Sequence, residues 1–330
     1  MNTKNFAHKE INEILQHSQK IAITTHIESD GDGMVAAYAL HYLLGLKGYE
    51  SFIITDGEQL SQYDFLGEMP TVIPYQPGLS FDTLVILDLN SKDRLGKRQQ
   101  LLEIAHKVVV LDHHLQENSP ISADYSIIDS SFVSVGALLY SLFAPEIAKL
   151  SKEERKYIAD CVYVTLLNDT NNFINANTDP ATFRLAAELV EAGAQPFYLY
   201  KQFMLNNSAG EMRYIGGTLA TIELELDEQI LTLYSTYELK QSCGVNPEEF
   251  RQATRYVQGV RKLKGLIYFR EDAPGEWKLS LRSVPVNVQQ IAAKYGGGGH
   301  RQASGCSMRG SLPEIKALLL KDFATALAEL

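Results

Sequence analysis

Four segments of this 330-residue chain carry aspartates and histidines at spacings that suit the binding of metal ions. In chain order they are His26-x-x-x-Asp30-x-Asp32, Asp88, Asp112-His113-His114 and Asp169. Carboxylates held within a few ångströms of one another raise one another's pKa, and a divalent cation offsets that cost. Mixed aspartate and histidine ligands suit manganese, iron or zinc better than calcium, which prefers oxygen alone. Two such ions about 3.5–4 Å apart would clamp a phosphoryl group, activate water and stabilise the leaving oxygen.

The order of elements predicted for residues 1–190 would bring these segments together. Short runs rich in valine and isoleucine alternate with helical patterns, which is typical of buried parallel strands. The strand runs are 21–26, 51–55, 84–87 and 108–111, and the clearest helical patterns are 34–46 and 152–167. His26, Asp88 and Asp112 lie where three of these runs end, and ligands of open α/β sheets bind at the carboxyl ends of the strands. We therefore expect one site at that edge, with Asp169 reaching it from the end of the 152–167 helix.

The pattern changes after about residue 190. Gly193 and Pro196 break the chain, and the composition of 206–210 indicates a hinge or loop. Strand-like runs then dominate at 218–226, 230–235, 265–269 and 277–282, and helical patterns return near 287–295 and 312–328. These features predict a parallel-sheet α/β domain over 1–190, a linker over 191–212 and a smaller α+β domain over 213–330.

A second set of residues suits the binding of phosphate. Four glycines, 296–299, run into His300, and glycine lets backbone N–H groups approach an anion closely. Residues 251–282 contain eight lysines or arginines and only three acids, although the whole chain has a net charge of −10. The alternatives are a flexible glycine linker and a charged face that only contacts solvent.

The composition excludes several classes of protein. A net charge of −10 argues against long duplex nucleic acid as a partner, although it allows a short nucleotide in a locally basic pocket. Cys161, Cys243 and Cys306 form no C-x-x-C pair, which argues against a disulfide framework and fits a reducing cytoplasm. No stretch approaches the roughly 18 apolar residues of a membrane span, so we expect a cytoplasmic protein without a membrane partner.

One rival hypothesis uses the same part of the chain. Gly31-x-Gly33-x-x-Ala36 follows a strand run and opens a helix, as a dinucleotide-binding fingerprint does, and Asp56 follows twenty residues later. The chain would then be an NAD-dependent dehydrogenase, but the other aspartates and histidines would have no role. A non-catalytic protein that binds a nucleotide at an inactive site is a further alternative, and the complete set of metal-ligand types argues against it.

Taken together, the motifs resemble those of the DHH phosphoesterase family, named for the triplet found here as Asp112-His113-His114. His26-x-x-x-Asp30-x-Asp32 resembles the family's first motif, VILDLN with Asp88 its second, and LNDTNNF with Asp169 its fourth. GGGGHRQASG resembles the DHH-associated C-terminal domain. Length and layout are most similar to the NrnA-type branch, nano-RNases that degrade short oligonucleotides and often dephosphorylate 3′-phosphoadenosine 5′-phosphate. RecJ-like single-strand exonucleases and phosphodiesterases of linear or cyclic dinucleotides remain alternatives.

The resemblance implies two divalent metal ions, with manganese preferred, in an active site in the cleft between the two domains. One ion would be held by His26, Asp30 and Asp88. The other would be held by Asp32, Asp88, His113 and Asp169, with Asp88 bridging the two. The resemblance also implies that Asp112 orients His113, and that His114 lies near the phosphoryl group as a proton donor or electrostatic stabiliser.

The substrate's phosphate and terminal nucleotide would, by the same resemblance, contact residues of the second domain. These are Arg282, Ser283, Gly297, Gly298, Gly299 and His300. The sequence departs from the family pattern at Ser29, where proline is common, and at Asn171, where glycine is common. These departures leave the metal ligands in place and leave substrate preference open. Whether the protein forms a homodimer is open as well.

Overall fold

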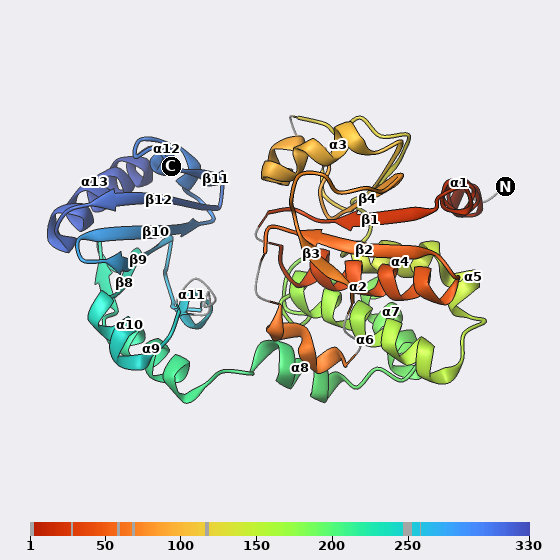
Figure 1. The fold of residues 1–330 in the computed structure, drawn as a ribbon. Helices are drawn as coiled ribbons and strands as arrows, with labels where there is room; N and C mark the ends of the chain where they lie inside the picture. Colours follow the sequence, from red (N-terminus) through yellow and green to blue (C-terminus); the bar gives the residue numbers. More distant parts are fainter. Residues whose placement is uncertain are drawn as a thin grey trace. The chain divides into compact units, whose positions relative to one another are not determined.

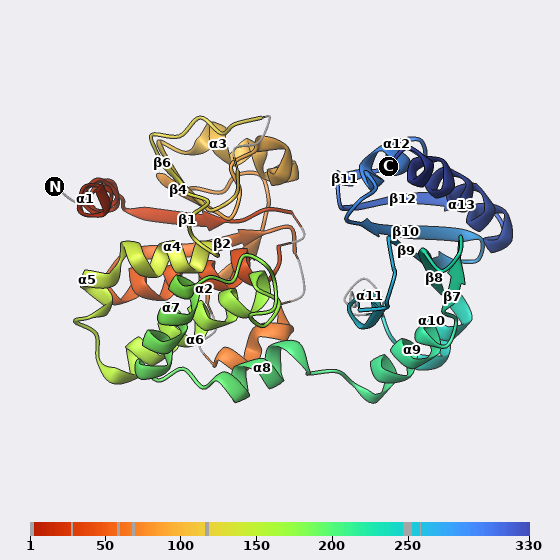
Figure 2. The same cartoon turned by 180° about the vertical axis from the view of Figure 1, so that it is seen from behind.

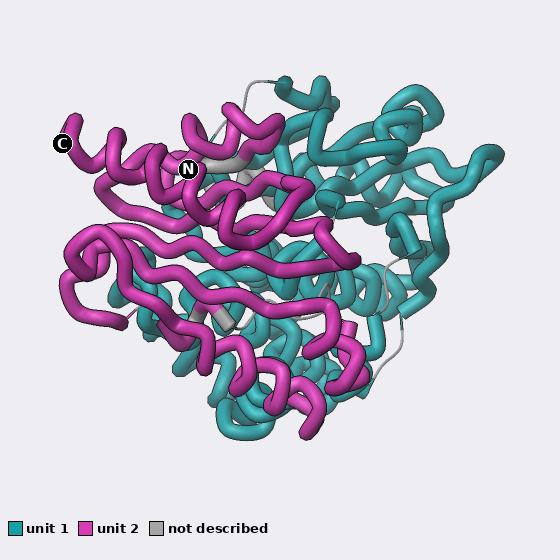
Figure 3. Tube along the Cα trace, turned by 90° about the vertical axis from the view of Figure 1, so that its left-hand side faces the viewer, with its two compact units in different colours: residues 1–206 teal, residues 207–330 magenta. Residues whose placement is uncertain are grey.

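The computed structural model of this protein describes residues 3–27, 29–57, 60–67, 70–115, 119–246, 253–257 and 259–330. The chain divides into two compact units, Met1–Asn206 and Asn207–Leu330, which Figure 3 colours separately. The boundary lies inside the predicted linker 191–212, much of which is helical, because it includes α8 (Pro196–Met204). Within the ranges given above, none of the helices combines the length and apolar character that crossing a membrane requires.

The first unit is built on a six-stranded parallel sheet with the strand order β3-β2-β1-β4-β5-β6 (Figure 1). Its strands are β1 (Lys20–Thr24), β2 (Glu50–Thr55), β3 (Val72–Pro74), β4 (Thr83–Leu87), β5 (Lys107–Asp112) and β6 (Tyr125–Ile128). The four predicted strand runs are confirmed as β1, β2, β4 and β5. Strand order reverses at β1, which pairs with β2 on one side and with β4 on the other, and such switch points are where open α/β sheets bind ligands.

Helices cover both faces of this sheet (Figures 1 and 2). They are α1 (Thr3–Gln16), α2 (Gly31–Leu46), α3 (Leu101–Ile104), α4 (Val135–Leu142), α5 (Ala144–Ile147), α6 (Lys152–Asp169), α7 (Pro180–Glu191) and α8, with the 3₁₀ helices η1 (Ser61–Leu66) and η2 (Lys92–Gln100). On one face α2, α4 and α6 pack against Ile23, Val85 and Leu111. On the other face, residues of η2 and α3 cover Ile54 and Ile86. Burial on both faces explains why the strand sequences are continuously apolar.

Helix α6 carries Asp169 from a well-defined start. The Ser151 hydroxyl accepts a hydrogen bond from the Glu154 N–H, and the Glu154 carboxylate accepts one from the Ser151 N–H at 2.8 Å. This pair is a capping box, and it satisfies N–H groups that a helix N-terminus leaves without partners. The helix then runs buried through the core to Asp169, which is its last residue. The next helix, α7, is capped by Asp179 and has Pro180 as its first residue.

The second unit contains a mixed six-stranded sheet with the order β11-β12-β10-β9-β8-β7. Its strands are β7 (Glu223–Glu225), β8 (Ile230–Ser235), β9 (Gly265–Ala273), β10 (Glu276–Ser283), β11 (Gly298–His300) and β12 (Ala303–Arg309). Its helices are α9 (Ala209–Leu219), α10 (Tyr237–Cys243), α11 (Ala253–Val257), α12 (Val288–Ala293) and α13 (Leu312–Ala328). Apolar residues of α12 and α13 pack on one face of the sheet, and residues of α9 and α11 pack near the other (Figure 1). The predicted smaller α+β architecture is confirmed.

The predicted strand at 218–226 is wrong in its first half. A capping box formed by Ser208 and Glu211 starts α9, which continues to Leu219, and only Glu223–Glu225 form a strand. The capping pair was readable in the sequence, but the two asparagines and the glycine around Ser208 suggested a loop. Local capping and burial of Tyr214 and Ile215 outweigh the preference of the following residues for a strand.

Candidate metal centre

The carboxyl edge of the first sheet brings together all the residues that the sequence proposes as metal ligands. His26 follows β1, Asp88 follows β4, and Asp112-His113-His114 begins at the last residue of β5. Three groups place their ligand atoms within 4.8 Å of one another: His26, Asp30 and Asp88; Asp32, His113 and Asp169; and Asp88, His113 and His114. Aspartate, histidine and aspartate in such proximity are donors that a divalent transition metal accepts.

Asp88 belongs to two of these groups because its two oxygens face different histidines. Oδ2 lies 3.4 Å from Nε2 of His26, and Oδ1 lies 3.4 Å from Nε2 of His113. The backbone of Asp88 has φ +65, a left-handed conformation that few residues other than glycine adopt, and its N–H donates to Leu111 O. Burial alone would raise the pKa of Asp88, but the imidazoles of His113 and His26 beside its two oxygens lower it below the usual aspartate range. Asp88 is therefore held ionised between two potential ion sites.

Asp32 is fixed by the N-terminus of a helix that lies far away in the sequence. Its carboxylate accepts the N–H groups of Val135 at 2.7 Å and Gly136 at 3.1 Å, the first two residues of α4. The positive end of the helix dipole stabilises a carboxylate in this position. Burial nevertheless raises the pKa of Asp32, and the charges of Asp169 and Asp88 raise it further. A divalent cation beside Asp32 would favour its ionised form.

His113 lies where three carboxylates converge. Its Nε2 is 3.1 Å from Asp169, 3.3 Å from Asp32 and 3.4 Å from Asp88. Burial would lower the pKa of His113, but the close approach of these three carboxylates raises it far above the usual histidine range. In the part of the chain that the structure describes, His113 Nε2 and Asp88 Oδ1 are buried atoms without a hydrogen-bond partner. One ring proton cannot satisfy three carboxylates, whereas a divalent cation can, so these residues fit a metal ion.

Asp112 was expected to orient His113, but its carboxylate contacts the ring of His114. Its Oδ1 accepts a hydrogen bond from Nδ1 of His114 at 2.8 Å, and it meets His113 only through the backbone N–H. Successive side chains of an extended backbone point to opposite sides, so residues two apart face the same way. Oδ2 of Asp112 accepts from Nδ2 of Asn90 at 2.6 Å. The result is a chain from Asn90 through Asp112 to His114, whose pKa Asp112 raises.

Asp169 is followed by an unusual left-handed turn. Asn171, Asn172 and Phe173 have φ values of +47, +61 and +63. Asparagine tolerates this conformation better than most residues, which explains how Asn171 can replace a glycine there. The side-chain amides of Asn175 and Asn177 both donate to the backbone oxygen of Asp169, at 3.0 and 3.1 Å. The loop is thus ordered around the ligand that precedes it.

The sequence analysis missed the residues that hold these ligands in place. Asn90, Asn175, Asn177 and the first turn of α4 carry no metal-binding chemistry of their own, so nothing in the ligand pattern identifies them. One signal was present: Ser134 precedes an apolar run and caps α4, accepting from the Ala137 N–H at 3.0 Å. A capped helix start points its N–H groups at an anion, and Asp32 is that anion.

The residues predicted to bind phosphate all belong to the second unit. Arg282 Nη1 donates to the backbone oxygen of Leu281 at 3.0 Å. The Ser283 hydroxyl donates to Lys264 O at 2.6 Å and accepts from the Val286 N–H, so its one proton is already committed to the protein. The side chain of His300 lies outside the described residues.

The glycine-rich segment is a strand rather than a flexible linker. Gly298–His300 form β11, which pairs with β12 and is the last strand of its sheet. A side chain at Gly297 would collide with the backbone of Gly305 and with Cys306, so close packing requires glycine there. The sequence predicted that these glycines let the backbone approach an anion closely. In the structure, the close approach seen is between Gly297 and the neighbouring strand β12.

The basic surplus of residues 251–282 is partly neutralised within the second unit. The Arg270 guanidinium donates to the Asp272 carboxylate at 2.6 Å, and Lys262 lies 3.6 Å from Glu228. Because Arg270 and Lys262 are paired with carboxylates, they contribute less to a phosphate site than the count of eight basic residues suggests.

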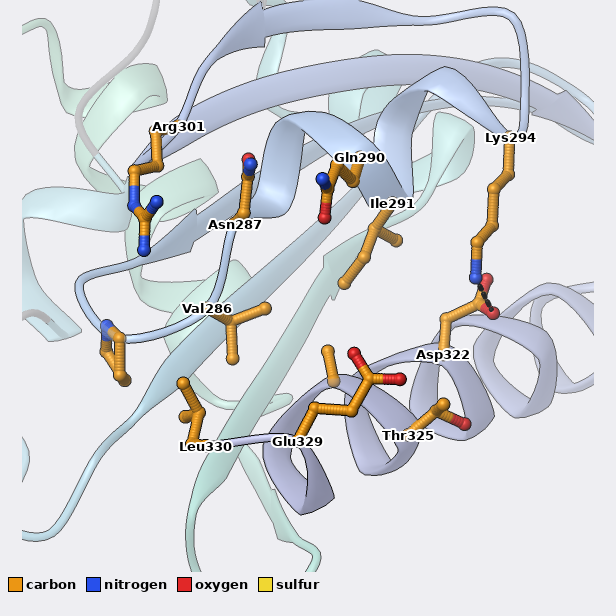
Figure 4. Close-up of a pocket in the computed structure, with 12 residues that line it drawn as sticks. Val286, Asn287, Gln290, Ile291, Lys294, Arg301, Asp322, Thr325, Glu329 and Leu330 are labelled. Carbon is orange, nitrogen blue, oxygen red and sulfur yellow. Dashed lines mark hydrogen bonds and ion pairs between the residues drawn. The ribbon is translucent and has the colours of Figure 1, made fainter.

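A cavity of about 520 Å³ opens in the second unit between α12 and the end of α13 (Figure 4). Gln290, Lys294 and Asp322 are among its lining residues, and the Lys294 ammonium is paired with Asp322 at 2.8 Å. Arg301, which follows the glycine-rich strand, also lines it, whereas Arg282, Ser283, Gly297 and Gly298 do not. Among the side chains that the structure describes, the predicted phosphate contacts therefore lie outside this cavity.

The geometry does not support the dinucleotide-binding alternative. Gly31 and Gly33 lie in the first turn of α2, where side chains would crowd Phe203 and Asp88, so their small size serves packing. Asp56, which that alternative would assign to a ribose, is instead 3.1 Å from the guanidinium of Arg98.

Comparisons with known proteins agree with the motif pattern. The DHH family, N-terminal domain, matches residues 20–166, and the DHHA1 domain matches residues 232–329. The bifunctional oligoribonuclease and PAP phosphatase NrnA of Mycoplasma pneumoniae is 25% identical over 312 residues, which are 92% of either chain. The protein of the same name from Thermus thermophilus is 28% identical over 88% of this chain and 84% of its own.

A solved structure shows the same fold. The exopolyphosphatase-related protein from Bacteroides fragilis has a TM-score of 0.83 at 20% identity, covering 97% of this chain and 96% of its own. Both domain types therefore occur here in one chain, in this order, and the motif residues meet at one sheet edge. The chain belongs to the DHH family of phosphoesterases, with a DHHA1 domain at its C-terminal end.

Proposed function

We propose that this protein is a metal-dependent phosphohydrolase that degrades short oligonucleotides and dephosphorylates 3′-phosphoadenosine 5′-phosphate. The observation that carries the proposal is the meeting of histidines and aspartates around Asp88, whose two oxygens face His26 and His113. Two relatives that the chain matches over most of their length are bifunctional oligoribonucleases and PAP phosphatases, which supports this choice of substrates.

The proposed ligand sets are those that the family resemblance implies, and the groups described above support them. One ion would be held by His26, Asp30 and Asp88, and the other by Asp32, Asp88, His113 and Asp169. Bound there, two divalent ions would supply Lewis acidity toward the phosphoryl and leaving oxygens and lower the pKa of an attacking water. Manganese suits this mixture of nitrogen and oxygen donors, and we take it as the preferred metal.

His114 has a separate task in this proposal. Asp112 holds its Nδ1, so Nε2 is the ring atom left to act on a substrate, and the side chain is 40% exposed. The hydrogen bond to Asp112 raises the pKa of His114 and so favours the protonated ring. The protonated ring can donate to a phosphoryl or leaving oxygen. The hydrogen bond from Asn90 fixes the Asp112 carboxylate and thereby the ring.

Substrate binding would use the second unit. Arg282, Gly297, Gly298 and Gly299 with His300 are the proposed contacts to the substrate's phosphate and terminal nucleotide, whereas Ser283 is engaged in the fold. A chain with a net charge of −10 lacks an extended basic track, so long strands gain little from counterion release. We infer a cytoplasmic enzyme that prefers substrates of about two to five nucleotides.

A hydrolysis screen tests the proposal. Dinucleotides, 5-mer and 24-mer RNA, 3′-phosphoadenosine 5′-phosphate, cyclic dinucleotides and pyrophosphate are compared with manganese and with a chelator. We expect metal-dependent hydrolysis, a higher kcat/KM for the short substrates than for the 24-mer, and a shallow salt dependence. A 24-mer cut as well as the 5-mer, with steep salt dependence, would indicate a RecJ-like exonuclease. Activity that survives the chelator would overturn the proposal altogether.

A further inference from the structure

A fully buried arginine lies beside the candidate metal centre and has no role in the function proposed above. Arg98 is 1% exposed and is the largest fully buried side chain among the described residues. It belongs to η2, in the connection between β4 and β5. Arginine is almost never fully buried unless its charge and its donors are satisfied, because desolvation of the guanidinium is costly. Its partners therefore indicate what it does.

The guanidinium of Arg98 joins the carboxyl ends of β1 and β2. Nη1 donates to Thr24 Oγ1 at 2.6 Å, to Thr25 O at 3.0 Å and to Ile54 O at 3.2 Å. Nη2 donates to the Asp56 carboxylate at 3.1 Å. Thr24 and Ile54 are the last paired residues of the β1–β2 ladder. Arg98 thus continues the connection between the two strands at the point where their backbone pairing stops.

The backbone oxygen of Thr25 belongs to the peptide group that leads into His26. On the other side of His26, the Ile27 N–H donates to Arg94 O at 2.8 Å, again within η2. Gly96 brings η2 close to this loop, since a Cβ there would lie 2.7 Å from Ile27 Cγ2. His26 is therefore held from both sides by one short segment of chain.

These two hydrogen bonds, from Arg98 to Thr25 O and from the Ile27 N–H to Arg94 O, determine where the imidazole of His26 points. Its Nδ1 is bonded to the backbone oxygen of Ile27 at 2.7 Å, which leaves Nε2 directed at Asp88, 3.4 Å away, and at Asp30, 4.0 Å away. A shift of the Thr25 carbonyl moves this ring. The ligands Asp32, His113 and Asp169 are positioned by α4, by the end of β5 and by the end of α6, and none of these is bonded to Arg98 by the contacts above.

We propose that Arg98 is a positioning residue for His26, and that it determines the affinity of the His26–Asp30–Asp88 site without affecting the Asp32–His113–Asp169 site. Only the effect of Arg98 on turnover rests on the proposed function. The affinities of the two sites are measured directly by metal binding. Lysine cannot replace Arg98, since an ammonium lacks the planar fork that reaches two strands. Methionine fills similar space without burying a charge, and Asp56, with a side chain 33% exposed, remains partly hydrated.

The test measures manganese binding to the full chain by equilibrium dialysis. For Arg98→Met we expect one ion bound with wild-type affinity and the second bound about 10- to 100-fold more weakly, as for residues that orient metal ligands. Arg98→Lys should resemble Arg98→Met. The matched control is Arg155→Met, because Arg155 also donates to a backbone oxygen, Leu150 O, but at the opposite end of α6 from Asp169. It should bind both ions normally.

Unfolding of each metal-free variant shows whether the fold is retained. If Arg98→Met fails to fold, Thr24→Val decides, because it keeps the arginine and removes one of its acceptors, together with the hydrogen bond that the Thr24 hydroxyl donates to Ile54 O. The proposal is overturned if a folded Arg98 or Thr24 variant binds both ions normally, or loses both equally. A wild-type protein that binds two ions but hydrolyses no phosphate ester defeats the proposed function alone, and one that binds fewer than two ions overturns both.

Discussion

Replacing Asp88 by asparagine should remove most of the catalytic activity by weakening both metal sites at once. The carboxylate is 2% exposed, and each of its oxygens faces a different group of ligands. A metal site with four protein ligands contributes about 10–16 kcal/mol of apparent binding free energy, so one ligand is worth roughly 3 kcal/mol. That corresponds to about a hundredfold in affinity for either ion.

Asparagine is a better probe of Asp88 than alanine because of the backbone. With φ at +65, an alanine would add strain of about 1 kcal/mol, whereas asparagine tolerates the left-handed region. Asp82→Asn is the matched control. Asp82 lies just before β4, at the opposite edge of the sheet, and its carboxylate accepts the Gln19 and Lys20 N–H groups. It makes the same change of charge and should leave both metal sites intact.

The assay combines manganese titration with steady-state kinetics on a 5-mer. We expect Asp88→Asn to bind both ions about a hundredfold more weakly and to lose at least that factor in kcat/KM at a fixed manganese concentration. The metal-free variant should keep the far-ultraviolet circular dichroism of the wild type. Two tightly bound ions together with near-normal turnover would refute the assignment of Asp88 as the shared ligand.

Three further outcomes follow from the same geometry. His114→Ala should lower kcat and kcat/KM together while two ions stay bound, and a fall to one ion would make His114 a ligand instead. Asn171→Gly should change the free energy of unfolding little, whereas Asn171→Ala should lower it by about 1 kcal/mol in urea titrations. The free energy of unfolding of the metal-free protein should fall as pH rises. The pKa values of Asp32, Asp169 and His113 are raised, so the native state binds more protons than the unfolded state does. The loss should begin at about pH 4 for the two aspartates and at about pH 6.5 for His113, where these groups titrate in the unfolded chain. Urea unfolding at pH 6 and pH 8.5 checks this, and manganese affinity should rise over the same range because protons must leave.

The sequence predicted the parts of the fold that depend on long apolar runs. β1, β2, β4 and β5 are buried on both faces, so their valines and isoleucines are unmistakable. In the first sheet, β3 and β6 were not predicted, and neither has a buried residue. β3 has only three residues, and β6 is an edge strand whose alternate residues are exposed. Short edge strands pair because a neighbouring strand offers its backbone, and this information is absent from their own side chains.

The candidate metal ligands could also be predicted from the sequence, but the residues that hold them in place could not. The end of a strand and the type of side chain together indicate which residues can reach a common edge. The tie between Asp32 and Val135 depends on where α4 begins in space, and the buried position of Arg98 depends on how η2 folds back over β1 and β2. Asp112 is intermediate: its place beside two histidines indicates a contact with one of them, but both lie beyond the end of β5, so only the structure shows that the partner is His114.

The construction of this edge explains why it needs so many supports. Asp32, Asp88 and Asp169 carry like charges within reach of one histidine, so in the absence of a cation they repel one another, and Asp88 adopts a backbone conformation that is itself strained. Such an arrangement persists only if the rest of the fold over-determines it. Three supports each hold one ligand without contacting another ligand. The first turn of α4 binds the Asp32 carboxylate, and the amides of Asn175 and Asn177 bind the Asp169 backbone oxygen. The Arg98 guanidinium binds the backbone oxygen of Thr25, next to His26. The edge is therefore pre-organised to hold metal ions, and the stability that this costs is supplied by the buried strands and helices on either side.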